Sequence, residues 1–362
     1  MPKYDYLFIS CVILLTVFGL VMLSSASSDL GKIKFNDTYF YLKHQIIYGL
    51  IFGIAGFLIA SRVTYKRLKS AAVPLLIFNI ILLILIFTPF GETYNTKSSR
   101  WLNFGGFSFQ PSEFLKISFI IYLSAWLSNK KMKRQTSFSK GLLPFLAASG
   151  IITGLIFLQP ATTIILIVMG AAFIVYFISG ARLLHILGIA FFGILILASI
   201  IYFSSYRYNR ISAFLNGGGE KQNSGYQLNQ SLSAIGSGGL TGVGFGKSTG
   251  KYKSLPEPIG DSIFAVIAEE LGFIGAAFLI IIFIIMFIRG FLIAKNAPDQ
   301  FSKLTVIGLI SIIAIQTFIH ITAISGLIPL TGVPLPFISF GGTSLAIFLT
   351  MTGIIANISR RT

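Results

Sequence analysis

Ten long apolar runs dominate this sequence and leave little choice of fold. A helix needs roughly 20 apolar residues to cross a bilayer, and fewer when flanking side chains snorkel. Only 11% of the 362 residues are charged, against about 25% in soluble domains. The sequence therefore predicts an all-α membrane protein, with ten transmembrane helices in one polytopic domain over residues 1–362. The predicted segments are 7–23, 46–60, 71–90, 114–127, 142–158, 161–178, 183–203, 263–288, 304–324 and 344–358.

The distribution of Lys and Arg predicts the orientation. Ten spans put both termini on one side, and the loops on that side are short and rich in basic residues. Such loops face the cytoplasm, so both termini are predicted to be cytoplasmic. The longest loop, about 204–260 between helices 7 and 8, is then extracellular. The net charge of +17 reflects topology and contact with anionic lipid, and no nucleic-acid partner is expected.

Two outer loops carry further structural signals. In the long loop, apolar residues recur at helical spacing, which predicts an amphipathic helix lying on the outer leaflet. These residues are Tyr226, Leu228, Leu232 and Ile235. The last outer loop, 327–344, contains Pro329, Pro334 and Pro336, which forbid a helix. A non-helical apolar segment at membrane depth must be buried in protein or line a cavity.

Asp261 lies where the long outer loop runs into the eighth apolar segment, within SLPEPIGDSIFAVIAEELGFIG from Ser254. A carboxylate at this junction has water on one side and a low dielectric on the other. Two interpretations remain open. Asp261 is either an N-cap of the following helix or a base that acts on a lipid-linked substrate.

Other charges lie within the apolar segments, where each costs about 2.5–3.5 kcal/mol on insertion scales. Glu113 and Lys116 are three residues apart and can pair on one helix face. Glu269 and Glu270 are adjacent, so at most one is expected to face Asp261. Two interpretations of these residues remain open: they form structural ion pairs, or they have a functional role.

Basic residues on the outer loops are candidates for binding phosphate, because Arg contacts phosphate bidentately and Lys acts as a point charge. Ordinary lipid headgroups are the competing ligand. The candidates are Arg207 with Arg210, Lys251 with Lys253, and Arg100 beside Trp101. No metal-ligand spacing, nucleotide fingerprint or Ser/His/Asp arrangement is found. His320 and Gln316, one turn apart, are predicted to form a buried hydrogen-bonded pair. The single cysteine, Cys11, excludes disulfides within the chain and cysteine metal clusters.

Five ordered strings carry a resemblance to a known family. They are RWLNFGGFSFQPSEFLK from Arg100, YRYNRISAFL from Tyr206, GYQLNQSLSAIGSGGLTGVGFG from Gly225, LPEPIGDSIFAVIAEELG from Leu255 and TGVPLPFISFGGTS from Thr331. Over essentially its whole length the chain resembles the SEDS family (shape, elongation, division and sporulation), whose members include FtsW, RodA and SpoVE. The KSTGK stretch and the PFISFGG ending resemble FtsW most.

The resemblance implies a peptidoglycan glycosyltransferase that polymerises lipid II outside the bacterial cytoplasmic membrane, in cell division or elongation. It implies that Asp261 is the general base. The substrate-binding residues expected with it are Arg100, Trp101, Gln110, Glu113, Lys116, Arg207, Arg210, Lys251, Glu257, Ser339 and Gly341. No cofactor is expected, apart from a divalent cation such as Mg²⁺ that would assist the pyrophosphate.

The partners that the resemblance implies are a class B penicillin-binding protein and other divisome or elongasome membrane proteins. Two alternatives stay open at this point. One is a lipid II flippase, which would need a charged path through the bilayer such as Glu113, Lys116, Glu269 and Glu270. The other is a non-catalytic scaffold for division proteins.

Overall fold

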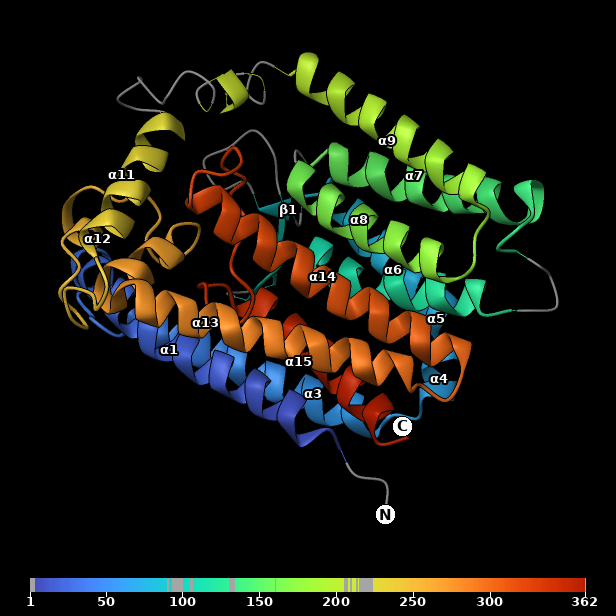
Figure 1. Ribbon diagram of the computed structural model, residues 1–362, viewed down its shortest axis with the longest axis horizontal. Helices are drawn as coiled ribbons and strands as arrows, with labels where there is room; N and C mark the ends of the chain where they lie inside the picture. Colours follow the sequence, from blue (N-terminus) through green and yellow to red (C-terminus); the bar gives the residue numbers. More distant parts are fainter. Residues whose placement is uncertain are drawn as a thin grey trace.

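The computed structural model is a tilted helical bundle (Figure 1). It describes residues 4–89, 91–92, 100–104, 107–129, 134–159, 161–204, 208, 210–212, 214 and 224–361. Arg207, one of the predicted phosphate ligands, lies outside the described residues. Each of the ten predicted segments overlaps a helix of this described part.

One group of helices contains both ends of the chain. It consists of α1 (Tyr6–Phe35), α2 (Phe40–His44), the π-helix η1 (Gln45–Ile51), α3 (Phe52–Arg62), α13 (Ile263–Lys295), α14 (Gln300–Ile324) and α15 (Gly342–Ser359). The other group consists of α4 (Tyr65–Ser70), α5 (Ala72–Leu85), α6 (Pro111–Leu127), the π-helix η3 (Phe138–Leu142), α7 (Leu143–Phe157), α8 (Thr162–Ile178) and α9 (Leu183–Tyr202). Helix α14 packs against α6, α8, α13 and α15 and joins the two groups.

Seven helices of the described part are long and apolar enough to cross a membrane. They are α1, the continuous run Phe40–Arg62, the run Phe138–Phe157, α9, α13, α14 and α15. Helices α5 and α8 are apolar but shorter, and α6 carries the charged pair Glu113 and Lys116 within its 17 residues. The chain is therefore a multi-pass membrane protein, as predicted.

The two termini lie side by side, away from the end of the bundle that holds α11 (Ser224–Ser237) and α12 (Gly250–Lys253) (Figure 1). The Asp5 amide donates to Ser359 Oγ over 3.1 Å, and Arg360 donates to the Tyr4 hydroxyl over 3.2 Å. Asp5 also caps α1, because its carboxylate accepts from the Phe8 amide.

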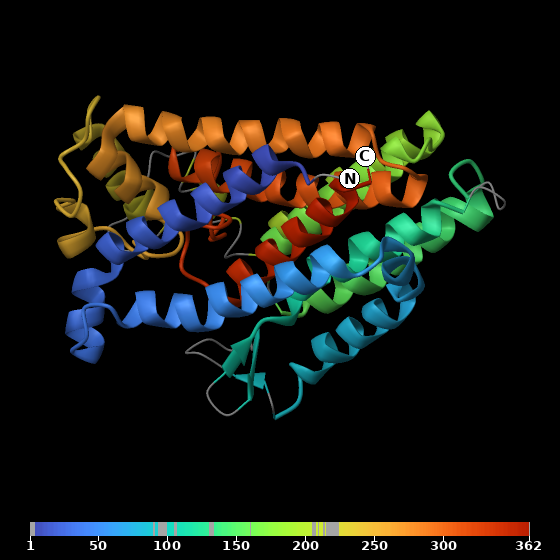
Figure 2. The ribbon, with the colours of Figure 1, turned by 90° about the horizontal axis from the view of Figure 1, so that it is seen from below.

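Two features depart from what the sequence predicts. A small antiparallel sheet, β1 (Gly91–Glu92), β2 (Trp101–Phe104) and β3 (Phe107–Phe109), precedes α6 in order β1-β2-β3 (Figure 2). Its pairing of Leu102 with Phe109 comes from alternating apolar residues in a segment that was expected to be a loop. Helix α11 forms where helical spacing predicted it, but it packs against α13 and α14.

Helix α13 is also interrupted, whereas one unbroken span was predicted. Gly272 has φ 67° and ψ −168°, which stops the helical hydrogen-bond pattern. The 239–244 loop supplies the missing partners. The Val243 and Gly244 amides donate to the carbonyls of Glu269 and Glu270 over 3.0 Å each. The short segment 263–271, just after Asp261, is thus fixed to this loop.

Candidate functional site

Asp261 lies in the loop before α13, and it is not the N-cap. The helix begins at Ile263 with Ser262 in the cap position. In the described residues no hydrogen bond to the Asp261 carboxylate is found. The N-cap interpretation is therefore wrong, and the Asp261 carboxylate remains available for another role.

The turn before Asp261 is fixed by a set of local hydrogen bonds. Glu257 adopts a left-handed conformation with φ 48°, and its carbonyl accepts from the Gly260 and Ser262 amides over 3.1 Å each. The Ser262 hydroxyl donates to the Pro256 carbonyl (2.7 Å) and accepts from Gln227 of α11 (3.1 Å). These contacts set the direction in which Asp261 points.

A small pocket of about 10 Å³, roughly the size of one water molecule, opens beside Asp261. It is lined by Asp261, Gln227 and His320, together with the start of the proline-rich segment that was predicted to line a cavity. A Cβ placed on Gly332 of that segment would lie 3.2 Å from Asp261 Oδ2 and 4.0 Å from Arg210 Nη1. Asp261 and Arg210 therefore approach the same glycine.

The segment 330–334 is not helical, so its backbone carbonyls lack the hydrogen-bond donors that a helix would provide. Four side chains donate to these carbonyls. The contacts are Arg210 Nη1 to Leu330 O (3.2 Å), Thr163 Oγ1 to Thr331 O (3.0 Å), His320 Nδ1 to Val333 O (2.6 Å) and Gln316 Nε2 to Pro334 O (2.8 Å). Donors from α8, α14 and the long outer loop thus hold one wall of the pocket in place.

His320 and Gln316 do not pair with each other as predicted; they bind neighbouring carbonyls. A carbonyl only accepts, so His320 Nδ1 carries the hydrogen and Nε2 is an acceptor. His320 is 1% exposed, and no hydrogen-bond partner of Nε2 is found in the described residues. No sequence pattern indicated that His320 would line the Asp261 pocket.

The Glu113–Lys116 pair forms as predicted, with 2.6 Å between Lys116 Nζ and Glu113 Oε1. Lys116 also donates to Gln316 Oε1 over 2.8 Å, which orients the Gln316 amide toward Pro334. Glu113 and Lys116 are buried and lie outside the pocket lining. The structure connects them to the pocket wall through Gln316.

Ser339 and Gly341 fasten the other end of the proline-rich segment. Ser339 Oγ donates to the Gly260 carbonyl and accepts from the Leu335 amide, over 2.8 Å each. The Gly341 amide donates to Gln45 Oε1 over 2.9 Å. Ser339 therefore links this segment to the residue before Asp261.

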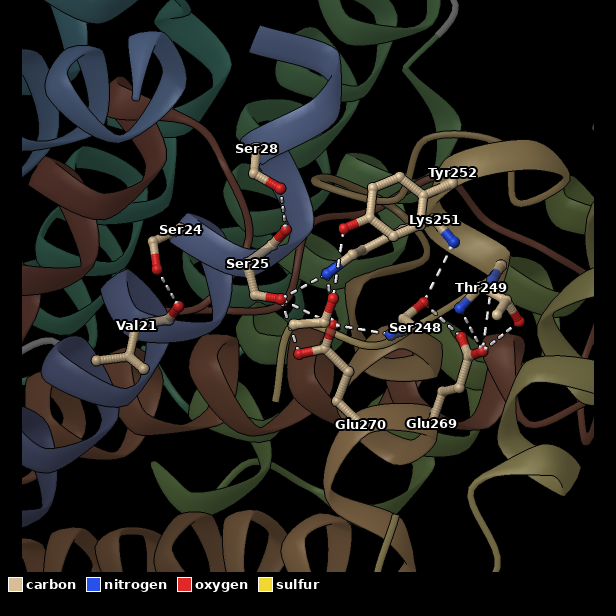
Figure 3. A network of polar contacts seen from close by, with 12 residues as sticks. Val21, Ser24, Ser25, Ser28, Ser248, Thr249, Lys251, Tyr252, Glu269 and Glu270 are labelled. Atoms are coloured by element: carbon tan, nitrogen blue, oxygen red, sulfur yellow. Dashed lines mark hydrogen bonds and ion pairs between the residues drawn. The ribbon is translucent and has the colours of Figure 1, made fainter. Parts of the chain in front are cut away.

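Lys251 does not line the Asp261 pocket; it belongs to a separate polar network with Ser25 and Glu270 (Figure 3). Its side chain is 1% exposed, and Nζ lies 2.7 Å from Glu270 Oε1 and 2.8 Å from Ser25 Oγ of α1. Glu269 accepts from the Ser248 hydroxyl and the Thr249 amide. Both glutamates thus bind the 248–251 segment, and the ammonium of Lys251 serves an internal ion pair.

The three remaining predicted residues lie in or next to the small β-sheet before α6. Arg100 is exposed and donates through Nε to the Gln159 carbonyl over 3.0 Å. Trp101 begins β2, and Gln110 directly precedes α6; both are partly exposed. None of the three lines the Asp261 pocket.

The setting of Asp261 changes its acidity. Withdrawal from bulk water, with a smaller contribution from the Glu257 carboxylate, raises the pKa of Asp261 to about 6. The Arg210 guanidinium opposes this shift. A carboxylate with a pKa close to the working pH is suited to accepting a proton.

The fold and this pocket define a class: a multi-pass membrane protein with an ionisable carboxylate at the end of the bundle away from the termini. The family model described as "Cell cycle protein", for FtsW, RodA and SpoVE, matches residues 5–362. The chain belongs to this family.

Two curated relatives agree with that assignment. The Stage V sporulation protein E of Bacillus subtilis is 38% identical over 98% of this chain and 97% of its own length. A protein of Geobacter metallireducens named probable peptidoglycan glycosyltransferase FtsW is 36% identical over 99% of this chain and 95% of its own length. The prediction of a glycosyltransferase is confirmed at the level of the family.

Solved structures show the same fold. A chain from a peptidoglycan synthase complex has a TM-score of 0.82 at 23% identity, covering 99% of this chain and 98% of that chain. The rod shape determining protein RodA of Thermus thermophilus has a TM-score of 0.72 at 24% identity, covering 99% and 97%.

Proposed function

We propose that this protein polymerises lipid II into glycan strands at the outer face of the bacterial cytoplasmic membrane, with Asp261 as the general base. The observation that carries the proposal is the setting of Asp261. Its carboxylate faces a pocket, has no helix-capping role and has a pKa raised to about 6.

In the proposed reaction, Asp261 removes the proton from the 4-hydroxyl of the acceptor GlcNAc. The freed oxygen attacks the anomeric carbon of the donor MurNAc, and the bond to undecaprenyl pyrophosphate breaks. A positioned base contributes typically about 10²–10⁴-fold, and holding two lipid-anchored sugars in line contributes as much as roughly 7–11 kcal/mol. The rigid 330–334 wall would supply part of that positioning.

Arg210 is the favoured pyrophosphate ligand, because its guanidinium lies near Gly332 and Asp261. Arg100 and Arg207 remain candidates on the surrounding loops. Lys251 is no longer a candidate pyrophosphate ligand, because its ammonium is already paired with the Glu270 carboxylate. The described residues contain no group of three His, Cys, Asp or Glu that could hold a metal. A divalent cation would therefore need substrate phosphates in addition to Asp261 and Glu257.

We also propose ten membrane crossings with both termini in the cytoplasm. The contacts between the ends of α1 and α15 support an even number of crossings. Asp261 then lies at the outer surface, where lipid II is polymerised. A class B penicillin-binding protein and other divisome or elongasome proteins are the proposed partners. Similarity to a chain of a peptidoglycan synthase complex supports the first of them.

The test is Asp261→Asn in a purified assay with lipid II and the partner. We expect loss of glycan polymer with an unchanged thermal unfolding midpoint or a higher one. The matched control is Asp29→Asn, which removes a partly exposed carboxylate on a different helix, α1. The Asp29→Asn variant should polymerise lipid II normally. Full activity of Asp261→Asn would eliminate the proposed base.

The same preparation separates the two alternatives. A flippase would move lipid II across liposomes without a partner, and a scaffold would form no polymer under any condition. The buried Glu113–Lys116 pair and the Glu269–Glu270 contacts are engaged within the protein, so they do not favour a charged path through the bilayer.

A further inference from the structure

A second pocket lies at the opposite end of the bundle, where the chain termini meet. It has a volume of about 220 Å³ and is lined by Ser61, Arg62, Asn357, Arg360 and Arg361. We call it the terminal arginine pocket. Three guanidinium groups and no carboxylate contribute to its lining.

These arginines have no acidic partner in the described part of the chain. The nearby carboxylates are already engaged. Asp5 pairs with Arg289 over 2.5 Å, and Asp299 caps α14 by accepting from the Ser302 amide. Three like charges around one cavity repel one another, and the α4 segment beside them adds more cations. A bound anion would relieve this repulsion.

The pocket is built from fixed parts. Asn357 donates to the carbonyls of Ala60 (2.8 Å) and Val63 (2.5 Å), which ties the end of α3 to α15. About one turn before Asn357 along α15, a Cβ on Gly353 would meet the backbone of Phe57 in α3, so α3 and α15 are in close contact. The distance between Arg62 and the two arginines that follow α15 is therefore set by packed helices.

Aromatic rings hold two of the guanidiniums. Arg360 Cζ lies 4.8 Å from the centre of the Tyr4 ring, and Arg361 Cζ lies 4.9 Å from that of Tyr65. Stacking on a ring limits the motion of a guanidinium while leaving N–H groups for other acceptors. Such pre-orientation lowers the entropic cost of binding a ligand.

We propose that the terminal arginine pocket binds a phosphate group, carried either by an anionic phospholipid headgroup or by free inorganic phosphate. Arginine matches phosphate oxygens with paired N–H donors. Helices α3 and α15 both end here, and their negative C-terminal dipole ends disfavour an anion, which is offset by three full positive charges. With the termini in the cytoplasm, the pocket faces the inner leaflet, where anionic headgroups attract basic segments.

The test uses the whole detergent-purified protein and native mass spectrometry with titrated phosphatidylglycerol, phosphatidylcholine or inorganic phosphate. We expect phosphatidylglycerol to bind more tightly than phosphatidylcholine. The combined substitutions Arg62→Gln, Arg360→Gln and Arg361→Gln should weaken it at least tenfold. Arg182→Gln removes an exposed arginine elsewhere in the chain and should leave binding unchanged. Equal binding by the triple variant and the unaltered protein would overturn the proposal.

A second arm distinguishes the carriers. If inorganic phosphate alone raises the thermal unfolding midpoint and the triple variant loses that rise, the site takes the free anion. If only phosphatidylglycerol does so, the occupant is the lipid headgroup. A triple variant with Lys in place of each Arg keeps the charge, and we expect it to bind between the Gln variant and the unaltered protein. No response to either ligand would contradict the proposal, and none of these results depends on polymerase activity.

Discussion

Gly332 faces Asp261 so closely that a methyl group on Gly332 would lie 3.2 Å from Asp261 Oδ2. Gly332 also has φ 67°, a conformation that other residues adopt only with strain. The segment 330–334 is thus in contact with the Asp261 carboxylate. This close approach requires that residue 332 has no side chain.

Gly332→Ala should therefore damage activity more than folding. We expect polymerisation to fall by up to about 100-fold, because a displacement near 1 Å at a reacting centre can have that effect. The measurement is the rate of glycan formation beside the thermal unfolding midpoint. Gly236→Ala on α11 is the control, since its Cβ meets nothing within 4 Å. Unchanged polymerisation by Gly332→Ala would contradict the role of this contact.

The pKa of Asp261 predicts a pH dependence. A base with a pKa of about 6 is ionised above that pH, so the rate should fall about tenfold per unit below it. Glu257→Gln removes a carboxylate that raises the pKa of Asp261, so the acidic limb should move to lower pH. Rate profiles from pH 4.5 to 8.5 would check both points, and a limb that does not move would argue against Asp261 as the titrating group.

The same raised pKa has a consequence for stability. Ordinarily this carboxyl has a pKa of 3.8, and here the folded value is about 6. Folding thus favours the protonated form, and this stabilising contribution is complete below pH 3.8 and lost as pH rises through 6. Asp261→Asn, which stays neutral, should raise the thermal unfolding midpoint at pH 8 more than at pH 5. A lower midpoint at pH 8 would show that the ionised carboxylate stabilises the fold.

Lys251 and Glu270 should behave as a structural pair. Removing one partner of a buried ion pair costs about 3–5 kcal/mol, so Lys251→Met and Glu270→Gln should each destabilise the protein strongly. The double substitution should cost less than the sum, which a double-mutant cycle of unfolding free energies measures. Additive losses would mean that the two side chains act independently.

Substitutions at His320 separate anchoring from substrate contact. His320→Leu leaves the Val333 carbonyl without its donor, at a cost of about 1–3 kcal/mol, and should lower polymerisation. His320→Asn keeps an N–H close to the position of Nδ1 and should retain most stability and activity. A stable but inactive Asn variant would instead show that Nε2 contacts substrate.

Local patterns explain which parts of the fold were predictable. The helices follow from apolar runs, and α11 from the spacing of Leu228 and Leu232. The break at Gly272 was missed because it depends on hydrogen bonds from the distant 239–244 loop. The sequence features that could have indicated this break are the adjacent Glu269 and Glu270 and the nearby Gly272, all within an apolar run. The β-sheet was missed because its three short strands are stable only when paired.

The candidate site was predictable to a similar degree. Asp261 and Arg210 stood out as charged residues at an outer surface, and the proline-rich segment as a cavity wall. The assignment of Lys251 failed because proximity in sequence to Asp261 does not reveal Glu270 and Ser25 as its partners. Thr163 and Gln227 were not identified because neutral polar residues in helices give no distinctive pattern.

The crossing of Gly242 and Gly272 constrains how this protein can change over evolutionary time. A side chain on either residue would strike the backbone of the other segment, so a change of side chain in the facing segment cannot relieve the clash. Descendants that keep the interrupted helix are expected to inherit both glycines together. A lineage that loses one should lose the loop geometry as well, and with it the orientation of the short helix that follows Asp261.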